Sequence, residues 1–114
     1  MSDPDSWILI ATDGATPVGM ACAEPLLGVD RAGPIVPGGV FLNLIYVLPE
    51  RWGEGIGGTL LDAVLAEAKR RGSSQIRLWT DEADNERAER LYLSRGFSRT
   101  GLVRDGAGEW ARTL

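Results

Sequence analysis

Glycine is concentrated just ahead of an amphipathic segment, at positions 53, 55, 57 and 58. Upstream, residues 40–47 form an almost unbroken apolar run that predicts a buried strand. Pro49 ends this strand because proline has no backbone N–H to donate to a ladder. A strand, a glycine-rich turn and a helix in this order predict an anion site, since the unpaired N–H groups and the dipole of a helix start attract phosphate.

The spacing of these glycines argues against two common nucleotide sites. No lysine follows them, and Lys69 is the only lysine in the chain, which argues against a P-loop. The order Gly53-x-Gly55-x-Gly57 also differs from the Gly-x-Gly-x-x-Gly of dinucleotide sites. Tight strand-to-helix turns often use glycine for shape alone, so the local pattern leaves a phosphate site and a plain turn equally open.

A second patterned segment lies downstream of the glycines, beyond one predicted helix and one predicted strand. It reads Asn85-x-x-Ala88-x-x-Leu91-Tyr92-x-x-x-Gly96-Phe97. Together with Val47-x-Pro49-x-x-x-Gly53-x-Gly55-Ile56-Gly57, it resembles the two signature motifs of GNAT-type N-acyltransferases, which bind acyl-CoA. The resemblance covers residues 41–101 well and the flanks loosely, and it favours a phosphate site over a plain turn.

The resemblance implies that acetyl-CoA binds as the co-substrate and that no metal is needed. In this family the pantetheine arm pairs with the backbone of the central strand, which here corresponds to Ile45, Tyr46 and Val47. The pyrophosphate would be held around the helix start by Trp52, Gly53, Glu54, Gly55, Ile56, Gly57, Gly58 and Thr59. Ile45 and Val47 are also apolar residues of a central strand, so a plain core role stands beside the binding role.

The second motif implies roles for Tyr92 and Asn85. Tyr92 stands where the family places the general acid that protonates the departing CoA thiolate. Without the motif, a tyrosine at this position of an amphipathic helix would be a core residue with its hydroxyl at the edge. Asn85 is a natural N-cap of the same helix and, by resemblance, also bonds the pantetheine amide, and the two roles are compatible.

The sequence departs from the family pattern in two places. The Gln or Arg that is common ahead of the glycines is replaced by Trp52, with Arg51 one place earlier, which leaves less cationic support for a pyrophosphate. The places where relatives often carry a glutamate as general base hold Phe41, Asn43 and Thr80. Asp81 and Glu82 are close by, although acids ahead of a helix usually complement its dipole. The base is then a water chain, or the amine loses its proton in bulk solvent.

Composition restricts the class of protein. The chain has 114 residues, which suits one domain, and a net charge of −4, which argues against nucleic acid as a partner. No apolar stretch reaches membrane-spanning length, and residues 1–6 lack the basic region of a secretory signal, so we expect a cytoplasmic protein with no membrane partner. With no histidine and one cysteine, Cys22, we expect no metal site and no intrachain disulfide.

Periodicity and turn residues predict an α/β (α+β) fold with a mixed central sheet and helices on its faces, in the order β-β-β-α-β-α-β-β. The predicted strands are 7–12, 18–23, 40–47, 75–80, 97–103 and 109–113, and the predicted helices are 56–71 and 86–95. We expect residues 1–6 to be disordered and residues 7–114 to form a single domain. Residues 25–39 contain three prolines and four glycines and predict a loop, either a functional one on the acceptor side or a flexible connector.

Two functions remain open. One is an N-acetyltransferase that moves an acetyl group by direct transfer from acetyl-CoA to a primary amine of an unidentified small molecule or peptide. The alternative is a CoA-binding, catalytically weak domain that acts as part of an assembly. In the family a strand and two helices precede the strand that Trp7 begins here, so we expect a minimal form or completion by a partner. Residues 7–10 would then be uncovered, and we expect a homodimer through the first hairpin or the terminal strand, residues 109–114.

Overall fold

The structure is a computed structural model that describes residues 5–28, 33–83 and 85–114. In these residues a mixed sheet has the spatial order β1-β2-β3-β4-β6-β5. The elements are β1 (Trp7–Asp13), β2 (Thr16–Leu27), β3 (Ile35–Val47), the 3-10 turn η2 (Pro49–Arg51), α1 (Ile56–Arg70), β4 (Gln75–Asp81), α2 (Glu86–Ser94), β5 (Ser98–Arg104) and β6 (Ala107–Thr113). The predicted fold class and element order are confirmed. The expected disorder of residues 1–6 falls mainly on residues 1–4, which lie outside the described residues.

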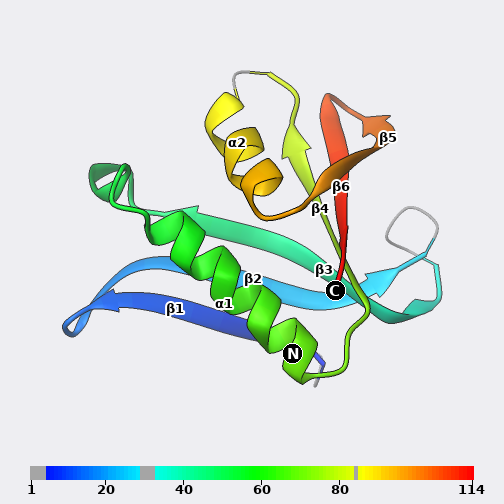
Figure 1. The fold of residues 1–114 in the computed structure, drawn as a ribbon, viewed down its shortest axis with the longest axis horizontal. Helices are drawn as coiled ribbons and strands as arrows, with labels where there is room; N and C mark the ends of the chain where they lie inside the picture. The colour runs from blue at the N-terminus through cyan, green and yellow to red at the C-terminus, as the bar shows by residue number, and fades with distance from the viewer. Residues whose placement is uncertain (1–4, 29–32, 84) are drawn as a thin grey trace.

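Helix α1 packs across β1, β2 and β3, and Figure 1 shows it crossing in front of these strands. Its Leu61 and Val64 side chains are fully buried against the sheet. The strand beneath carries very small residues. This contact requires them, because a Cβ at Gly19 would lie only 3.0 Å from Leu60 Cδ1. Gly19, Ala21 and Ala23 make this strand thin, which lets the helix approach closely.

Strands β3 and β4 are parallel neighbours for only a short distance. Their paired positions are Gly39 with Gln75, Val40 with Ile76 and Phe41 with Arg77. Beyond Phe41, β4 continues beside β6 over its whole length, whereas β3 continues beside β2. Figure 1 shows the two strands separating there, with β3 running to the tip of η2 and β4 turning toward α2. The sheet is thus split along one edge of its central strand.

The loop predicted over residues 25–39 is wrong at residues 25–27 and 35–39, which belong to strands, and residues 29–32 of it lie outside the described residues. Strand β2 extends to Leu27 and β3 begins at Ile35, and these two residues are paired across the strands. A register irregularity between Pro25 and Leu27 lets the ladder continue past a proline, since a bulge leaves one residue without a ladder partner. Gly39 is required for contact and not for a turn, because a Cβ there would lie 2.8 Å from Leu26 Cβ.

The helix ends differ slightly from expectation. Helix α1 ends at Arg70, and Gly72 follows in the left-handed region with φ of +83°. Glu67 forms an ion pair with Arg71 at 2.6 Å, and Arg70 contacts the same carboxylate at 2.5 Å. These hydrogen bonds hold the pKa of Glu67 at about 2.

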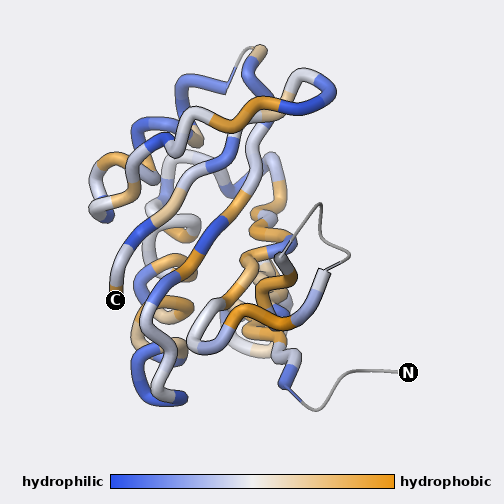
Figure 2. Tube along the Cα trace, turned by 90° about the vertical axis from the view of Figure 1, so that its right-hand side faces the viewer, coloured by the Kyte–Doolittle hydropathy of each residue, from blue (hydrophilic) through white to orange (hydrophobic). Residues whose placement is uncertain are grey.

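Hydropathy along the chain follows the layers of the fold. In Figure 2 apolar segments lie mainly within strands and helices, and the turns are mostly hydrophilic. Among the described helices, none is both long enough and apolar enough to cross a bilayer. A single core cluster joins α1, α2 and the buried face of the sheet, with Leu61, Ile76, Leu78 and Trp110 at its centre.

We predict that Gly19→Ala lowers the free energy of unfolding by about 1–3 kcal/mol, the usual cost of overpacking. The added Cβ would lie 2.8 Å from the Tyr46 carbonyl oxygen, which belongs to the backbone of the neighbouring strand and cannot move aside cheaply. Chemical denaturation measures the change. Gly28→Ala is the matched control, because its Cβ would lie at an ordinary 3.5 Å from Pro34, and we expect a change within about 0.5 kcal/mol. Equal losses in the two variants would contradict the packing argument.

Candidate functional site

The glycine turn leaves the start of α1 open. Gly53 and Gly55 adopt φ values of +88° and +82°, which side chains with a Cβ rarely reach, and no atom lies within 4 Å of where a Cβ would be placed. Gly55 is the N-cap and offers no side chain to the helix, whose first turn begins with Thr59 N–H donating to the Gly55 carbonyl at 3.1 Å. The N–H groups of residues 56–58 consequently have no carbonyl partner within the helix.

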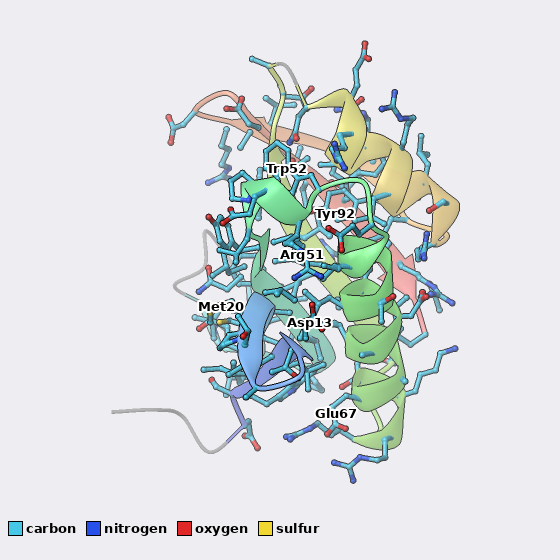
Figure 3. The ribbon with its side chains drawn as sticks, turned by 90° about the vertical axis from the view of Figure 1, so that its left-hand side faces the viewer. Asp13, Met20, Arg51, Trp52, Glu67 and Tyr92 are labelled. Atoms are coloured by element: carbon cyan, nitrogen blue, oxygen red, sulfur yellow. The ribbon has the colours of Figure 1, made fainter. Side chains whose placement is uncertain are left out.

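The Arg51 side chain is paired with two carboxylates of the same chain. Its guanidinium donates to the Glu54 carboxylate at 2.9 Å and forms an ion pair with Asp13 at 3.2 Å. The hydrogen bond with Glu54 raises the pKa of Arg51 and lowers the pKa of Glu54. Figure 3 shows Arg51 with Asp13 beside the start of α1. The positive charge of Arg51 is largely compensated, so it adds little attraction for an anion.

Trp52 forms a cover over the turn from β3 to α1. Its indole N–H donates to the Val47 carbonyl at 2.9 Å, while the ring itself remains exposed. The Arg87 guanidinium of α2 lies over this ring, with its central carbon 5.2 Å from the ring centroid. No described carboxylate forms an ion pair with Arg87. The sequence patterns did not single out this arginine, although a cation in the first turn of a helix, where acids are preferred, is an available signal.

A cavity of about 300 Å³ lies in the split between β3 and β4. It is lined by Leu42, Asn43, Leu44 and Ile45 of β3, by Leu78, Trp79, Thr80 and Asp81 of β4, and by Asn85, Ala88 and Tyr92 of α2. Because β3 pairs with β4 only as far as Phe41, the edge of β3 that lines this cavity has no ladder partner among the described strands. Free backbone groups on such an edge can bind an extended ligand in the manner of an added strand.

The structure brings most of the sequence-predicted residues to this opening. Ile45, Asn85 and Tyr92 line the cavity, and the residues of the 52–59 segment lie where β3 leads into α1. Val47 packs against the core and also lies near Gly57, with a Cβ there 3.9 Å from Val47 Cγ2. Thr59 uses its hydroxyl to donate to the Gly55 carbonyl at 3.1 Å. The side chain of Tyr46 is exposed on the opposite face of the sheet, so only its backbone can contribute.

Tyr92 belongs both to the core and to the cavity wall. Its side chain is only 6% exposed, and its ring centroid lies 5.8 Å from that of Phe97 and 6.0 Å from that of Trp110. Burial raises the pKa of the Tyr92 hydroxyl, which therefore stays protonated at neutral pH. No described group forms a hydrogen bond with this hydroxyl. The arrangement suits a proton donor whose position is fixed by aromatic packing.

Asn85 occupies the N-cap position of α2 but does not act as a cap. No side-chain cap hydrogen bond is present, and its amide nitrogen instead donates to Thr80 Oγ1 and, at 3.2 Å, to the Asp81 carbonyl. The predicted side-chain N-cap is therefore wrong, because the Asn85 side chain bonds instead to residues at the end of β4. These hydrogen bonds fix the start of α2, which lines the cavity, to the end of β4.

Two carboxylates near the cavity already have partners within the protein. Asp81 accepts a hydrogen bond from the Ala83 N–H at 3.0 Å, and Glu82 forms an ion pair with Arg99 at 2.6 Å. Of these two carboxylates, only Asp81 lines the cavity. Within the described ranges, no cluster of three or more His, Cys, Asp or Glu side chains is placed to hold a metal ion.

The chain is similar to known acetyltransferases in sequence and in structure. A model of the acetyltransferase (GNAT) family matches residues 1–97. A segment of 58 residues is 47% identical to a mycothiol acetyltransferase of Thermobispora bispora, covering 48% of this chain and 19% of that protein. The chain thus spans about a fifth of the length of this curated relative.

Solved structures of acetyltransferases share the fold. A PaiA N-acetyltransferase from Thermoplasma acidophilum in complex with coenzyme A superposes with a TM-score of 0.78 at 21% identity, covering 96% of this chain and 62% of that one. A ribosomal-protein-alanine N-acetyltransferase from Brucella melitensis superposes with a TM-score of 0.77 at 25% identity, covering 94% and 68%. The chain thus shares its overall fold with these acetyltransferases over nearly its whole length.

Proposed function

Because the chain belongs to the acetyltransferase (GNAT) family, we propose that it transfers an acetyl group from acetyl-CoA to a primary amine of a small molecule or peptide. We place this activity in the cytoplasm. The observation that carries the proposal is the alignment of an open helix start with an unpaired strand edge, because acetyl-CoA has an anionic pyrophosphate followed by an extended, amide-containing arm. A coenzyme A complex of a structurally similar protein agrees with this choice of donor.

The donor would bind through backbone groups. The pyrophosphate lies at the start of α1, where the N–H groups of residues 56–58 and the helix dipole favour negative charge. Gly53 and Gly55 give it room, and Arg87 of α2 supplies a cation that Arg51 cannot. The pantetheine arm extends along β3 at Ile45 to Val47, where it completes the missing ladder, and the amide of Asn85 faces it from α2.

The reaction is a direct acyl transfer. The neutral amine attacks the thioester carbonyl carbon, its C–N bond forms, and negative charge develops on the oxygen, which a β3 N–H stabilises. The C–S bond then breaks, and the Tyr92 hydroxyl gives its proton to the departing thiolate, which leaves as the thiol. The amine proton passes to solvent and solvent returns a proton to Tyr92, so that the products are an amide and coenzyme A. Holding both reactants in the split accounts for much of the rate gain.

The alternative is a domain that binds coenzyme A but transfers slowly. Two observations favour it: the carboxylate that lines the donor cavity, Asp81, is engaged by the Ala83 N–H, and Arg51 is neutralised by Glu54 and Asp13. Thermal-shift titration with acetyl-CoA, followed by a thiol-release assay over a panel of primary amines, separates the two functions. Stabilisation without thiol release from any amine would support the alternative.

We predict that Gly57→Val lowers the affinity for acetyl-CoA at least tenfold. The position is helical with an ordinary φ, and its Cβ would lie at an ordinary 3.6 Å from Leu91 Cδ2, so the variant should fold while the methyl groups of valine narrow the space between the start of α1, β3 and α2. Calorimetric titration measures the affinity, and circular dichroism verifies the fold. Ala66→Val, which places the same side chain on an exposed part of α1, should bind acetyl-CoA as the parent does. Unchanged affinity in Gly57→Val would exclude the pyrophosphate site.

We predict that Tyr92→Phe lowers kcat by roughly a hundredfold, a typical general-acid contribution, with little change in the Kd for acetyl-CoA. The substitution keeps the ring that packs against Phe97 and Trp110 and removes only the hydroxyl. Steady-state kinetics and calorimetry give the two constants. If kcat is the same in both proteins, Tyr92 has only a packing role.

The last part of the proposal is self-association, through a surface that differs in part from the one expected from the sequence. The Trp7 side chain is only 9% exposed, because it packs into the core beneath Arg71, so it cannot contribute to a contact. The terminal strand β6 lies between β4 and β5 and therefore offers no free edge. Ile8 and Ile10 of the edge strand β1 are 58% and 60% exposed on the face away from α1. They adjoin exposed Leu44 and Tyr46 through β2, which forms an apolar surface of the kind that associates.

We predict a homodimer through this surface at micromolar concentration. Light scattering should give twice the mass of the chain, and Ile10→Lys should give the mass of one chain, because it places a charge at the centre of the contact. Ala66→Lys, on the exposed side of α1 and so on the other face of the sheet, is the control and should leave the dimer intact. A monomeric parent protein, with or without acetyl-CoA, would contradict the prediction.

A further inference from the structure

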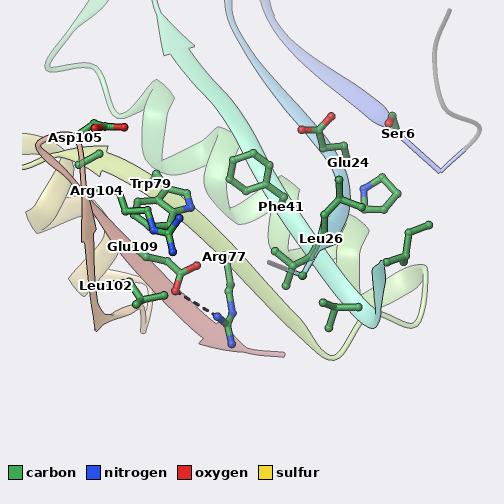
Figure 4. Close-up of a pocket in the computed structure, with 16 residues that line it drawn as sticks. Ser6, Glu24, Leu26, Phe41, Arg77, Trp79, Leu102, Arg104, Asp105 and Glu109 are labelled. Carbon is green, nitrogen blue, oxygen red and sulfur yellow. Dashed lines mark hydrogen bonds and ion pairs between the residues drawn. The ribbon is translucent and has the colours of Figure 1, made fainter. Parts of the chain in front are cut away.

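A second and larger cavity, of about 910 Å³, lies on the face of the sheet away from the helices. Figure 4 shows its walls, with Glu24 and Phe41 on one side and Trp79 and Glu109 on the other. Side chains alternate along a strand, so Leu78 points into the core while Arg77 and Trp79 point into this cavity. The volume falls within the range of small-molecule sites.

Trp79 lines this cavity and also the smaller one between β3 and β4. Trp79 therefore forms part of the wall of both spaces, at the level where β3 and β4 lose contact just beyond Phe41 and Arg77. If acetyl-CoA occupies the smaller cavity, as proposed above, its thioester would lie across Trp79 from the larger one. An acceptor entering from this side would approach the donor without crossing the start of α1.

The charged groups of the larger cavity differ in how they are engaged. Glu109 is only 5% exposed, and its carboxylate accepts hydrogen bonds from Arg77 at 3.2 Å and from Thr100 at 2.8 Å. Glu24 is half-buried, and no described residue forms a hydrogen bond or ion pair with its carboxylate. A third carboxylate of the lining, Asp105, lies in the exposed turn between β5 and β6, so Glu24 is the carboxylate beside the split that is able to take a positively charged ligand.

Sheet register places Glu24 beside the split. It is paired with Phe41 on β3, which is paired in turn with Arg77 on β4, so the three residues form the last continuous row before the strands separate. Adjacent strands lie about 4.8 Å apart, so Glu24 is about 10 Å from β4 along this row. That separation lets the carboxylate hold an arriving cation while it remains too far from the split to act on the reacting carbonyl.

We propose that the larger cavity binds the acceptor as its ammonium ion, with Glu24 as the binding carboxylate and Phe41 and Trp79 as the walls for an apolar body. The inference rests on the proposed function for the position of the donor. Aromatic faces attract cations as well as apolar groups, which suits an ammonium carried on an apolar or aromatic skeleton. The ammonium loses its proton to solvent before the neutral nitrogen moves past Trp79 to the thioester.

Binding of a probe can be measured without acetyl-CoA. Phenethylamine is the probe, and 2-phenylethanol, which has nearly the same shape and no charge, is the matched ligand. The indole N–H resonance of Trp79, assigned from the Trp79→Phe variant, reports occupancy in a nuclear magnetic resonance titration. We expect phenethylamine to shift this resonance and to bind at least tenfold more weakly to Glu24→Gln, whereas the affinity for 2-phenylethanol should not change.

Controls separate this inference from the proposed function. Glu86→Gln, which removes an exposed carboxylate from α2 outside the cavity, should bind phenethylamine as the parent does. If Glu24→Gln fails to fold, Glu24→Thr takes its place with the same expectation. In kinetics with an amine that the parent acetylates, Glu24→Gln should raise the KM for the amine and leave the KM for acetyl-CoA unchanged.

Equal phenethylamine affinity in the parent and in Glu24→Gln would overturn the inference, as would the absence of any shift at Trp79. Failure of the parent to bind acetyl-CoA would instead overturn the proposed function, and the amine titration, which contains no acetyl-CoA, would still report on Glu24.

Discussion

The early separation of β3 from β4 is the constraint on which the rest of the structure depends. Strand β4 is paired along its whole length with β6, and β3 is paired along most of its length with β2, but the two central strands share only the ladder from Gly39 to Phe41. Each half of the sheet keeps its own partner, so both can twist apart without losing hydrogen bonds elsewhere. The cost is an unpaired strand edge in the middle of the protein, and an extended ligand can compensate for it.

The two helices keep this opening in place from one face. Helix α1 lies on β1–β3 and brings its start to the end of β3, whereas α2 carries Tyr92 toward Trp110 in the other half. They meet where Leu91 faces the first turn of α1 near Gly57. Close packing on one half depends on small residues such as Gly19, and on the other half on aromatic contacts. The opening thus lies between two halves that pack in different ways and share one core.

Sequence reasoning predicted the order of the elements, the helix that follows the glycines and the residues around Tyr92, because these depend on local periodicity and on two spaced motifs. It failed over residues 25–39, where proline and glycine indicated a loop but in fact accommodate a bulge and a close contact with Leu26. It also assigned Trp7 to the surface, since burial under α1 depends on tertiary packing. Arg87 and Glu24 were not identified as site residues, because each gains its place only when distant strands and helices come together.

The net charge of the chain affects ligand binding in both cavities. The chain carries a net charge of −4, so its overall field opposes the binding of a polyanion and favours the approach of an ammonium ion. A polyanion must therefore be bound by groups that act at short range, such as the N–H groups at the start of α1 and the guanidinium of Arg87. A cation is attracted over a longer distance and needs only one free carboxylate at the end of its path. With the assignments proposed above, the same acidic chain admits an anionic donor at the split and a cationic acceptor on the face of the sheet away from the helices, with Trp79 lining both sites.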